Sequence, residues 1–95
     1  MVATGTLQAP EELTVQQVRD FGTGLLASLR TGSPLGVDLS RVQHLDTAGV
    51  QLLVLARREA ERAGLPLDFM RPAPIVVETL QFCGLAGVLE ASAQP

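Results

Sequence analysis

The alternation of apolar and polar positions across residues 37–63 predicts a buried strand, a tight loop and a helix. The strand is a short apolar run of the kind that helices cover, with apolar side chains at Val37, Leu39, Val42 and Leu45. From Ala48 to Ala63 the apolar positions follow helical spacing. Asp46 and Thr47 stand where the loop becomes the helix, so unpaired backbone N–H groups and the positive end of the helix dipole lie beside them. We therefore expect the function to reside at this helix start.

The rest of the chain continues the alternation of strands and helices. Residues 1–9 hold a weak first strand, Val2–Gln8, that suits the edge of a sheet. An amphipathic helix follows, with Val15 on its apolar side, and Thr14 and Gln17 are expected to form a capping box at its start. Beyond the central helix the pattern predicts a strand at 65–70, a helix at 74–82, a short edge strand within 83–90 and a flexible end at 91–95.

This order of elements predicts the fold class. With right-handed crossovers it gives an α/β fold, in which a small, mostly parallel or mixed sheet of about four strands is covered by about three to four helices. A length of 95 residues with 46% hydrophobic content suits one domain over residues 1–95 with a single core.

The two faces of the central helix differ in composition. One carries mostly small apolar residues that allow a close approach to a sheet, namely Gly49, Leu52, Leu53, Ala56, Ala60 and Ala63. The opposite face is predicted to meet solvent and holds Val50, Gln51, Val54, Arg57, Arg58 and Glu61, with Thr47 next to them. Two valines among charged residues are not required there for folding. They are either ordinary isolated exposed side chains or part of a docking stripe, and the sequence leaves both readings open.

Charge and composition exclude several classes of function. The net charge is −3 and all seven basic residues are Arg, so a basic surface for nucleic acid is not expected. Three Phe without Trp or Tyr offer no platform for stacking bases. No apolar run approaches the ~20 residues of a membrane helix, and the N-terminal residues do not resemble a signal peptide. We expect a cytoplasmic protein that does not insert into a membrane.

Candidate catalytic and metal-binding residues are sparse. His44 is the single histidine, and a role as a base with Thr47 or Cys83 is the enzymatic alternative, but a histidine in a loop is more often a surface residue. No cluster with metal-ligand spacing and no glycine-rich phosphate loop is present, so we expect no cofactor and no metal. Cys83 is interpreted as a small buried apolar residue, and one cysteine suits a reducing compartment.

Three motifs carry a family resemblance. They are DLS at 38–40, DTAG at 46–49 with LL after it, and GL at 84–85. Together they resemble the STAS domain, the fold shared by bacterial anti-sigma factor antagonists, over about Leu13 to Leu85. The resemblance implies a non-enzymatic regulatory module that docks a protein partner, such as an anti-sigma or sensor-type kinase. Residues of the DTAG loop and the following helix would bind that partner, and the candidates are His44, Asp46, Thr47, Ala48, Gly49, Val50, Gln51, Val54 and Arg58.

The loop departs from the family pattern at the position that is usually phosphorylated. Antagonists of the partner-switching type typically read DSSG or DSAG, with the acceptor hydroxyl just before the glycine, where this chain has Ala48. The neighbouring hydroxyl of Thr47 is the remaining phosphorylation candidate. A phosphate there would add about two negative charges beside Asp46 and repel a partner. The structural alternative is that Thr47 caps the helix and Asp46 orders the loop.

The DTAG form has a second resemblance, to the small cytoplasmic STAS subunit of the bacterial phospholipid-trafficking ABC transporter. In that subunit a threonine of the loop faces the ATPase subunit, so an ATPase is the alternative partner. The oligomeric state stays open between a monomer and a weak homodimer, since the edge strand Val2–Gln8 could pair with a second copy.

Overall fold

The central feature of the computed structural model, which describes residues 5–90, is a three-stranded parallel sheet. Its strands are β1 (Gly5–Gln8), β3 (Leu35–Asp38) and β5 (Leu67–Met70), in the order β1-β3-β5. In the register of the sheet Leu7 pairs with Val37, and Val37 pairs with Phe69. All four residues of β3 are buried, as expected for a central strand with covered faces.

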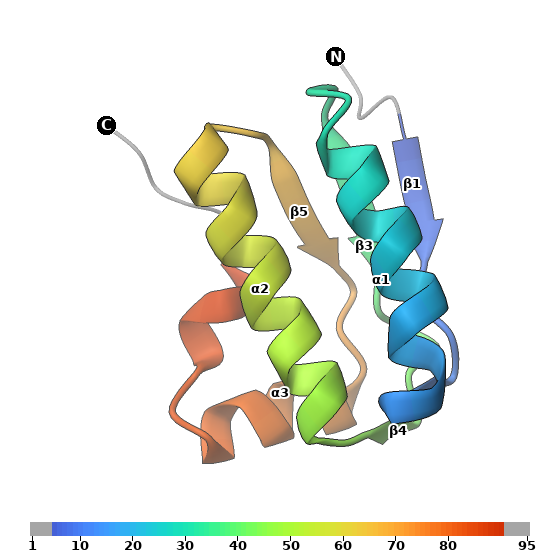
Figure 1. The fold of residues 1–95 in the computed structure, drawn as a ribbon. Helices are drawn as coiled ribbons and strands as arrows, with labels where there is room; N and C mark the ends of the chain where they lie inside the picture. The colour runs from blue at the N-terminus through green and yellow to red at the C-terminus, as the bar shows by residue number, and fades with distance from the viewer. Residues whose placement is uncertain (1–4, 91–95) are drawn as a thin grey trace.

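Two long helices, α1 (Val15–Leu29) and α2 (Thr47–Ala63), pack side by side over one face of this sheet (Figure 1). The core lies between helices and sheet, and its fully enclosed large side chains are Leu13, Leu25, Leu29, Leu39, Leu53, Leu80, Val37, Val42 and Val76. Gly64 ends α2 in the left-handed conformation, with φ of 69°, which confirms the predicted end of that helix. The α/β class with a mostly parallel sheet is confirmed.

The predicted single strand from Val37 to Leu45 is wrong. The chain leaves the sheet at Asp38, whose carboxylate accepts a hydrogen bond from the backbone N–H of Ser40 at 2.8 Å and thereby fixes a turn. It becomes extended again at β4 (His44–Leu45), which pairs in parallel with β2 (Glu12–Leu13) in a separate two-stranded sheet. Because β2 precedes α1 and β4 precedes α2, this small sheet brings the starts of both helices together.

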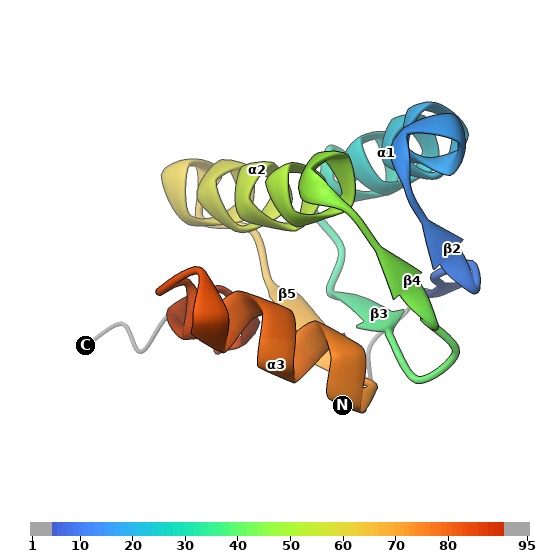
Figure 2. The same cartoon turned by 90° about the horizontal axis from the view of Figure 1, so that it is seen from below.

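The C-terminal part of the chain packs beside α2. Helix α3 (Pro74–Phe82) has the predicted bounds and contacts β4, and a 3₁₀ helix, η1 (Ala86–Leu89), contacts α2 and α3 (Figure 2). The edge strand predicted within 83–90 is therefore wrong. Gly84, with φ of 72°, turns the chain, and the backbone carbonyl of Val88 accepts a hydrogen bond from a side chain of α2 instead of from a strand.

Some predicted bounds and faces differ in the structure. The predicted strand at 65–70 begins at Leu67, because the Leu65 backbone N–H bonds to α2 at the Ala60 carbonyl. Val15 is 68% exposed and not on the buried side of α1. The expected strand residues 1–4 and the flexible end 91–95 lie outside the described residues. Within residues 5–90, no helix combines the length and the apolar character that crossing a membrane requires.

Candidate functional site

The two helix starts share one carboxylate, that of Asp46. Its Oδ1 accepts a hydrogen bond from the Gly49 backbone N–H, and its Oδ2 accepts one from the Val15 backbone N–H, both at 3.0 Å. Asp46 is thus the N-cap of α2 and also supplies an acceptor to the first turn of α1. These backbone donors, that of Gly49 above all, lower the pKa of the Asp46 carboxyl. Asp46, rather than Thr47, caps α2, so the expected capping role of Thr47 is wrong.

The expected capping box at α1 also differs in detail. Thr14 occupies the N-cap position, but its hydroxyl donates to Gln17 Oε1 at 2.8 Å and accepts no backbone N–H. The Gln17 N–H, which a capping box would pair with the Thr14 hydroxyl, donates to the Thr14 carbonyl oxygen at 2.9 Å instead, and Asp46 accepts from the Val15 N–H. The loop before α2 therefore fixes the start of α1.

Gly49 lets α2 approach β2 closely. A Cβ atom at this position would lie 2.1 Å from the Leu13 carbonyl oxygen and 2.7 Å from Leu45 Cδ1. No side chain fits there, so the glycine of the DTAG motif has a packing role at this point. It is buried and is not available to a partner.

Thr47 is the first residue of α2 and is exposed. Among residues 5–90 its hydroxyl has no hydrogen-bond partner. The hydroxyl is therefore free at the positive end of the α2 dipole, next to the Asp46 carboxylate.

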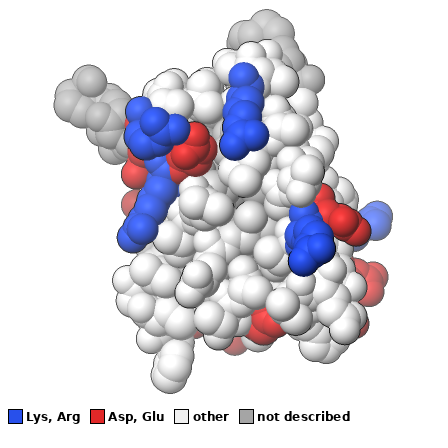
Figure 3. All heavy atoms as spheres, viewed as in Figure 1, with Lys and Arg blue, Asp and Glu red and all other residues white. Residues whose placement is uncertain are grey.

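An open hollow of about 800 Å³ runs along α2 from this hydroxyl. It is bounded by Val18 of α1 on one side and by Cys83 and Leu85, between α3 and η1, on the other. The side chains of α2 that line it are Thr47, Ala48, Val50, Gln51, Leu52, Val54, Leu55 and Arg58. Figure 3 shows the face formed by α1 and α2, where the charged side chains lie toward the upper and outer parts and a broad uncharged area occupies the middle.

We call the exposed or half-buried residues of α2 that line this hollow the outer face of α2, namely Thr47, Ala48, Gln51, Val54, Leu55 and Arg58. Leu55 is 49% exposed and is, with Val15 and Phe82, one of the large apolar side chains that the described residues expose. Leu55 was not among the predicted partner-binding residues. Helical spacing could have predicted its position, because Leu55 lies four residues after Gln51 and three before Arg58.

The structure separates the nine predicted partner-binding residues into two groups. Six of them line the hollow, namely Thr47, Ala48, Val50, Gln51, Val54 and Arg58. The other three do not: Asp46 is occupied as a cap, Gly49 is buried against β2, and His44 is exposed on β4 outside the hollow.

Two residues predicted to meet solvent on α2 are buried. Val50 is only 7% exposed and forms part of the floor of the hollow. Arg57 is 5% exposed, and its Nε and Nη1 donate to the carbonyl oxygens of Val88 and Leu67 at 2.9 and 3.0 Å. Burial lowers the pKa of the Arg57 guanidinium. Its Cζ lies 5.1 Å from the centre of the Phe69 ring, so the cation also rests on an aromatic face.

Arg57 therefore joins η1 to β5 beneath α2. Ala63, expected on the buried face, is exposed near the end of the helix, whereas the other five small or apolar residues of that face are buried as predicted.

The C-terminal end of α3 is unusually apolar at the surface. Phe82 is 93% exposed, and Cys83, which was expected to be buried, is exposed and lines the hollow. The chain turns away at Gly84, so neither side chain is drawn into the core. Among residues 5–90 no group of three or more potential metal-ligating side chains is present.

Comparison with known families shows the family to which the chain belongs. The family model described as "Mlab, STAS domain" matches residues 2–90. The chain belongs to the STAS domain family. STAS domains are generally non-enzymatic binding modules of the anti-sigma factor antagonist type. No curated protein is similar enough to the chain to count as a match.

In the DLS motif of this STAS domain, the Asp38 carboxylate is engaged by polar partners. Asp38 is buried, and its carboxylate accepts from the Ser40 backbone N–H and forms an ion pair with Arg71. Hydrogen bonds from Ser40 and then from Arg71 hold the pKa of the Asp38 carboxyl far below its usual range. Arg71 adopts a left-handed backbone conformation with φ of 48°, so the ion pair is made at a strained position. These groups satisfy one another at the carboxyl ends of β3 and β5.

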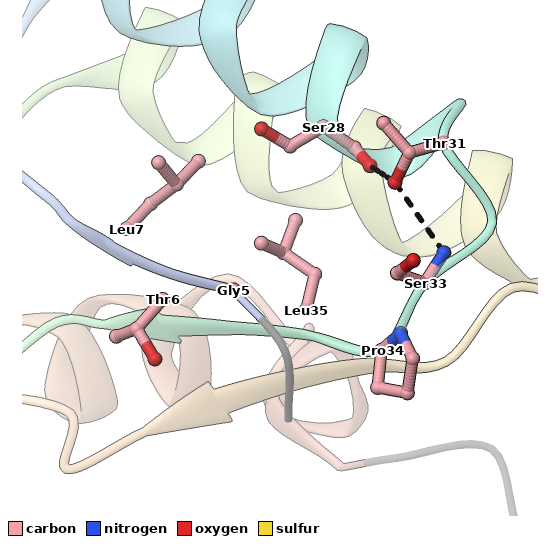
Figure 4. A pocket seen from close by; sticks show the side chains of 8 residues that line it. All are labelled: Gly5, Thr6, Leu7, Ser28, Thr31, Ser33, Pro34 and Leu35. Atoms are coloured by element: carbon pink, nitrogen blue, oxygen red, sulfur yellow. Dashed lines mark hydrogen bonds between the residues drawn. The ribbon is translucent and has the colours of Figure 1, made fainter. Parts of the chain in front are cut away.

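A second hollow, of about 330 Å³, lies between β1 and the end of α1 (Figure 4). The Thr31 hydroxyl in it is already in use, since it donates to the Ser28 carbonyl and accepts from the Ser33 backbone N–H. None of the predicted site residues lines it. The outer face of α2 remains the candidate site.

Proposed function

We propose that this STAS domain is a regulatory module that docks a protein partner on the outer face of α2, beside the free hydroxyl of Thr47. The observation that carries the proposal is the open hollow of about 800 Å³ with its mainly apolar lining. Exposed apolar surface rimmed by polar groups is typical of protein interaction sites. The family supports the proposal, because STAS domains generally act by binding.

The chemistry of the hollow favours a protein over a nucleotide. Among the described residues, Arg58 is the single charged side chain that lines it, and a nucleotide would place several phosphate charges there. The hollow is also broad and open, whereas small-molecule sites enclose most of their ligand. Hydrolysis of ATP or GTP is the alternative of another class. Turnover by the purified protein that is abolished in a His44→Ala variant would establish it.

Two kinds of partner fit the proposal, and both would act in the cytoplasm. The first is an anti-sigma or sensor-type kinase, which would switch the module by phosphorylating Thr47. A phosphate there would lie next to the Asp46 carboxylate at the rim of the hollow and oppose docking. Mass spectrometry after incubation with the kinase tests this step, and an unmodified Thr47 with a kinase of verified activity would contradict it.

The second candidate is the ATPase subunit of a phospholipid-transport ABC system. Ala48 at the usual acceptor position favours this candidate, because it leaves Thr47 as a hydroxyl that can contact a partner without modification. The neighbouring genes distinguish the two candidates. Permease and ATPase genes would favour the ABC system, and kinase genes would favour the kinase.

Calorimetric titration with kinase and ATPase subunits encoded in the same gene cluster tests the docking surface. We expect the double variant Thr47→Glu, Val54→Asp to lose binding of the partner. The matched control is Thr23→Glu, Val15→Asp, which makes the same two changes at exposed positions of α1 outside the hollow. Equal binding by both double variants would contradict the proposal.

A further inference from the structure

Phe82 is the most exposed large apolar side chain of the described residues. It is the last residue of α3 and is 93% exposed, whereas the other two phenylalanines, Phe21 and Phe69, are half-buried and buried. Its neighbour Cys83 lines the hollow along α2. The domain therefore presents a protruding phenyl ring directly beside an apolar hollow, on the same part of its surface.

We infer that the hollow is filled by a second copy of this chain, with Phe82 of each copy inserted into the hollow of the other. A knob and a hollow on one surface are complementary to themselves when two copies are related by a two-fold axis. The hollow, at about 800 Å³, is large enough to accept a phenyl ring with space for its neighbours. The two equivalent Phe82 insertions would then form a dimer with two-fold symmetry.

The charges beside the knob and the hollow are complementary. Glu78 is exposed and lies one helical turn before Phe82, so both side chains share one side of α3. Arg58 is exposed and lines the hollow. Neither residue forms an ion pair within residues 5–90. A copy that seats its Phe82 in the hollow brings its Glu78 to the rim, where the Arg58 of the other copy is free to pair with it.

This self-association would regulate docking, and that consequence rests on the proposed function. The dimer covers the outer face of α2, so a partner that binds there competes with the second copy. Since the contact is limited to one hollow and one ring in each copy, we expect a weak dimer that dissociates on dilution. A partner would bind more strongly to dilute protein than to concentrated protein.

Sedimentation equilibrium over a range of concentrations measures the dimer directly. We expect Phe82→Ser to raise the dimer dissociation constant by more than about tenfold, because an isologous interface loses the anchor twice. Val15→Ser is the matched control, as Val15 is 68% exposed and lies outside the hollow, and should change it less than about twofold. A wild-type protein that stays monomeric at about 1 mM overturns the inference. So does a dimer that Phe82→Ser leaves unchanged, which would indicate another interface such as the β1 edge.

Charge reversal provides a sharper test. Glu78→Arg alone and Arg58→Glu alone each place like charges opposite one another in both halves of the dimer. When the two variants are mixed, every pair in the mixed dimer has opposite charges again. We expect each variant alone to associate more weakly than the wild type and the mixture to regain association. A mixture that associates no better than its components contradicts the inference.

Cross-linking gives a third readout. Cys83 is the single cysteine and is exposed at the proposed interface. A short bis-maleimide should therefore join two wild-type copies through Cys83 and should join Phe82→Ser copies far less. Equal yields with both proteins would count against the dimer. Failure of partner titration with the dimer intact would overturn the proposed function alone, whereas partner binding without any dimer would overturn this inference alone.

Discussion

Arg57 and Arg58 are neighbours on α2, yet their guanidinium groups lie in different environments. Arg57 is 5% exposed and is fixed by two backbone carbonyls and the ring of Phe69. Arg58 is exposed, lines the hollow and makes no ion pair within residues 5–90. The same residue type thus links parts of the fold on one side of the helix and stays exposed, without an ion pair, on the other.

The difference extends along the whole helix. The inner face of α2, with Gly49, Leu53 and Arg57, is closed by backbone, apolar side chains and hydrogen bonds from β2 to η1. The outer face has a free hydroxyl, a half-exposed leucine and an unpaired cation. Changes on the inner face should therefore affect stability, and changes on the outer face should affect association.

The largest effect is expected at Gly49. An added methyl group would lie 2.1 Å from the Leu13 carbonyl oxygen. Because this oxygen belongs to the backbone of β2, it cannot move away without displacing that strand. We expect Gly49→Ala to lower the free energy of unfolding by about 3 kcal/mol or more, measured by urea denaturation. Gly24→Ala is the matched control, because nothing lies within 4 Å of its added Cβ on α1. It should stabilise the protein by about 0.5–1 kcal/mol. Equal losses in both variants would refute the packing role of Gly49.

The second largest effect on stability is expected at Arg57, in comparison with its neighbour Arg58. Arg57→Met keeps an apolar stem but removes the donors to Val88 and Leu67, so two carbonyl groups lose their partners. We expect it to lower the free energy of unfolding by about 2–4 kcal/mol. Arg58→Met should stay within about 0.5 kcal/mol of the wild type, as is usual for an exposed side chain. Similar values for the two variants in the same denaturation experiment would remove the distinction between the faces.

Acid should weaken the junction of the helices. The folded-state pKa of Asp46 lies below its ordinary value of 3.8, so the folded state binds fewer protons than the unfolded state. Its contribution to stability is complete above that ordinary value and is lost as the pH falls toward the folded-state pKa. We expect the melting temperature to fall below about pH 4, and less steeply in Asp46→Asn than in the wild type. An unchanged slope in Asp46→Asn would contradict the double capping.

The smallest effect on stability is expected at Phe82. Because its side chain is 93% exposed, Phe82→Ser removes almost no buried contact from the monomer. Its free energy of unfolding should stay within about 0.5 kcal/mol of the wild type at concentrations where the protein is monomeric. A loss of more than about 2 kcal/mol would mean that Phe82 belongs to the fold and not to an interface.

The sequence predicted those parts of the fold that local patterns determine. Helical spacing and the end at Gly64 located α2 within one residue, and the family motifs pointed to the correct fold. Pairings between distant segments were not predictable in this way. The small β2–β4 sheet consists of two residues in each strand, and Asp46 reaches a backbone N–H that is 31 positions away.

The wrong predictions of exposure on α2 include Arg57 and Val50. Arg57 was predicted on the solvent face, although it lies four residues after Leu53 and three before Ala60, both of which are buried. Val50 was assigned to the same side and lies beside the buried stripe, one residue after Gly49. The carbonyl groups that bind Arg57 cannot be predicted from local sequence, because they belong to η1 and β5.

The most direct test of the docking surface is a calorimetric titration of the partner from the same gene cluster into Val54→Asp and into its control, Val15→Asp. Val54 is half-buried in the wall of the hollow, and Val15 is exposed on α1 outside it. We expect Val54→Asp to weaken binding by more than about tenfold and Val15→Asp to bind as the wild type does. Wild-type affinity in Val54→Asp would contradict the assignment of the outer face of α2 as the docking surface.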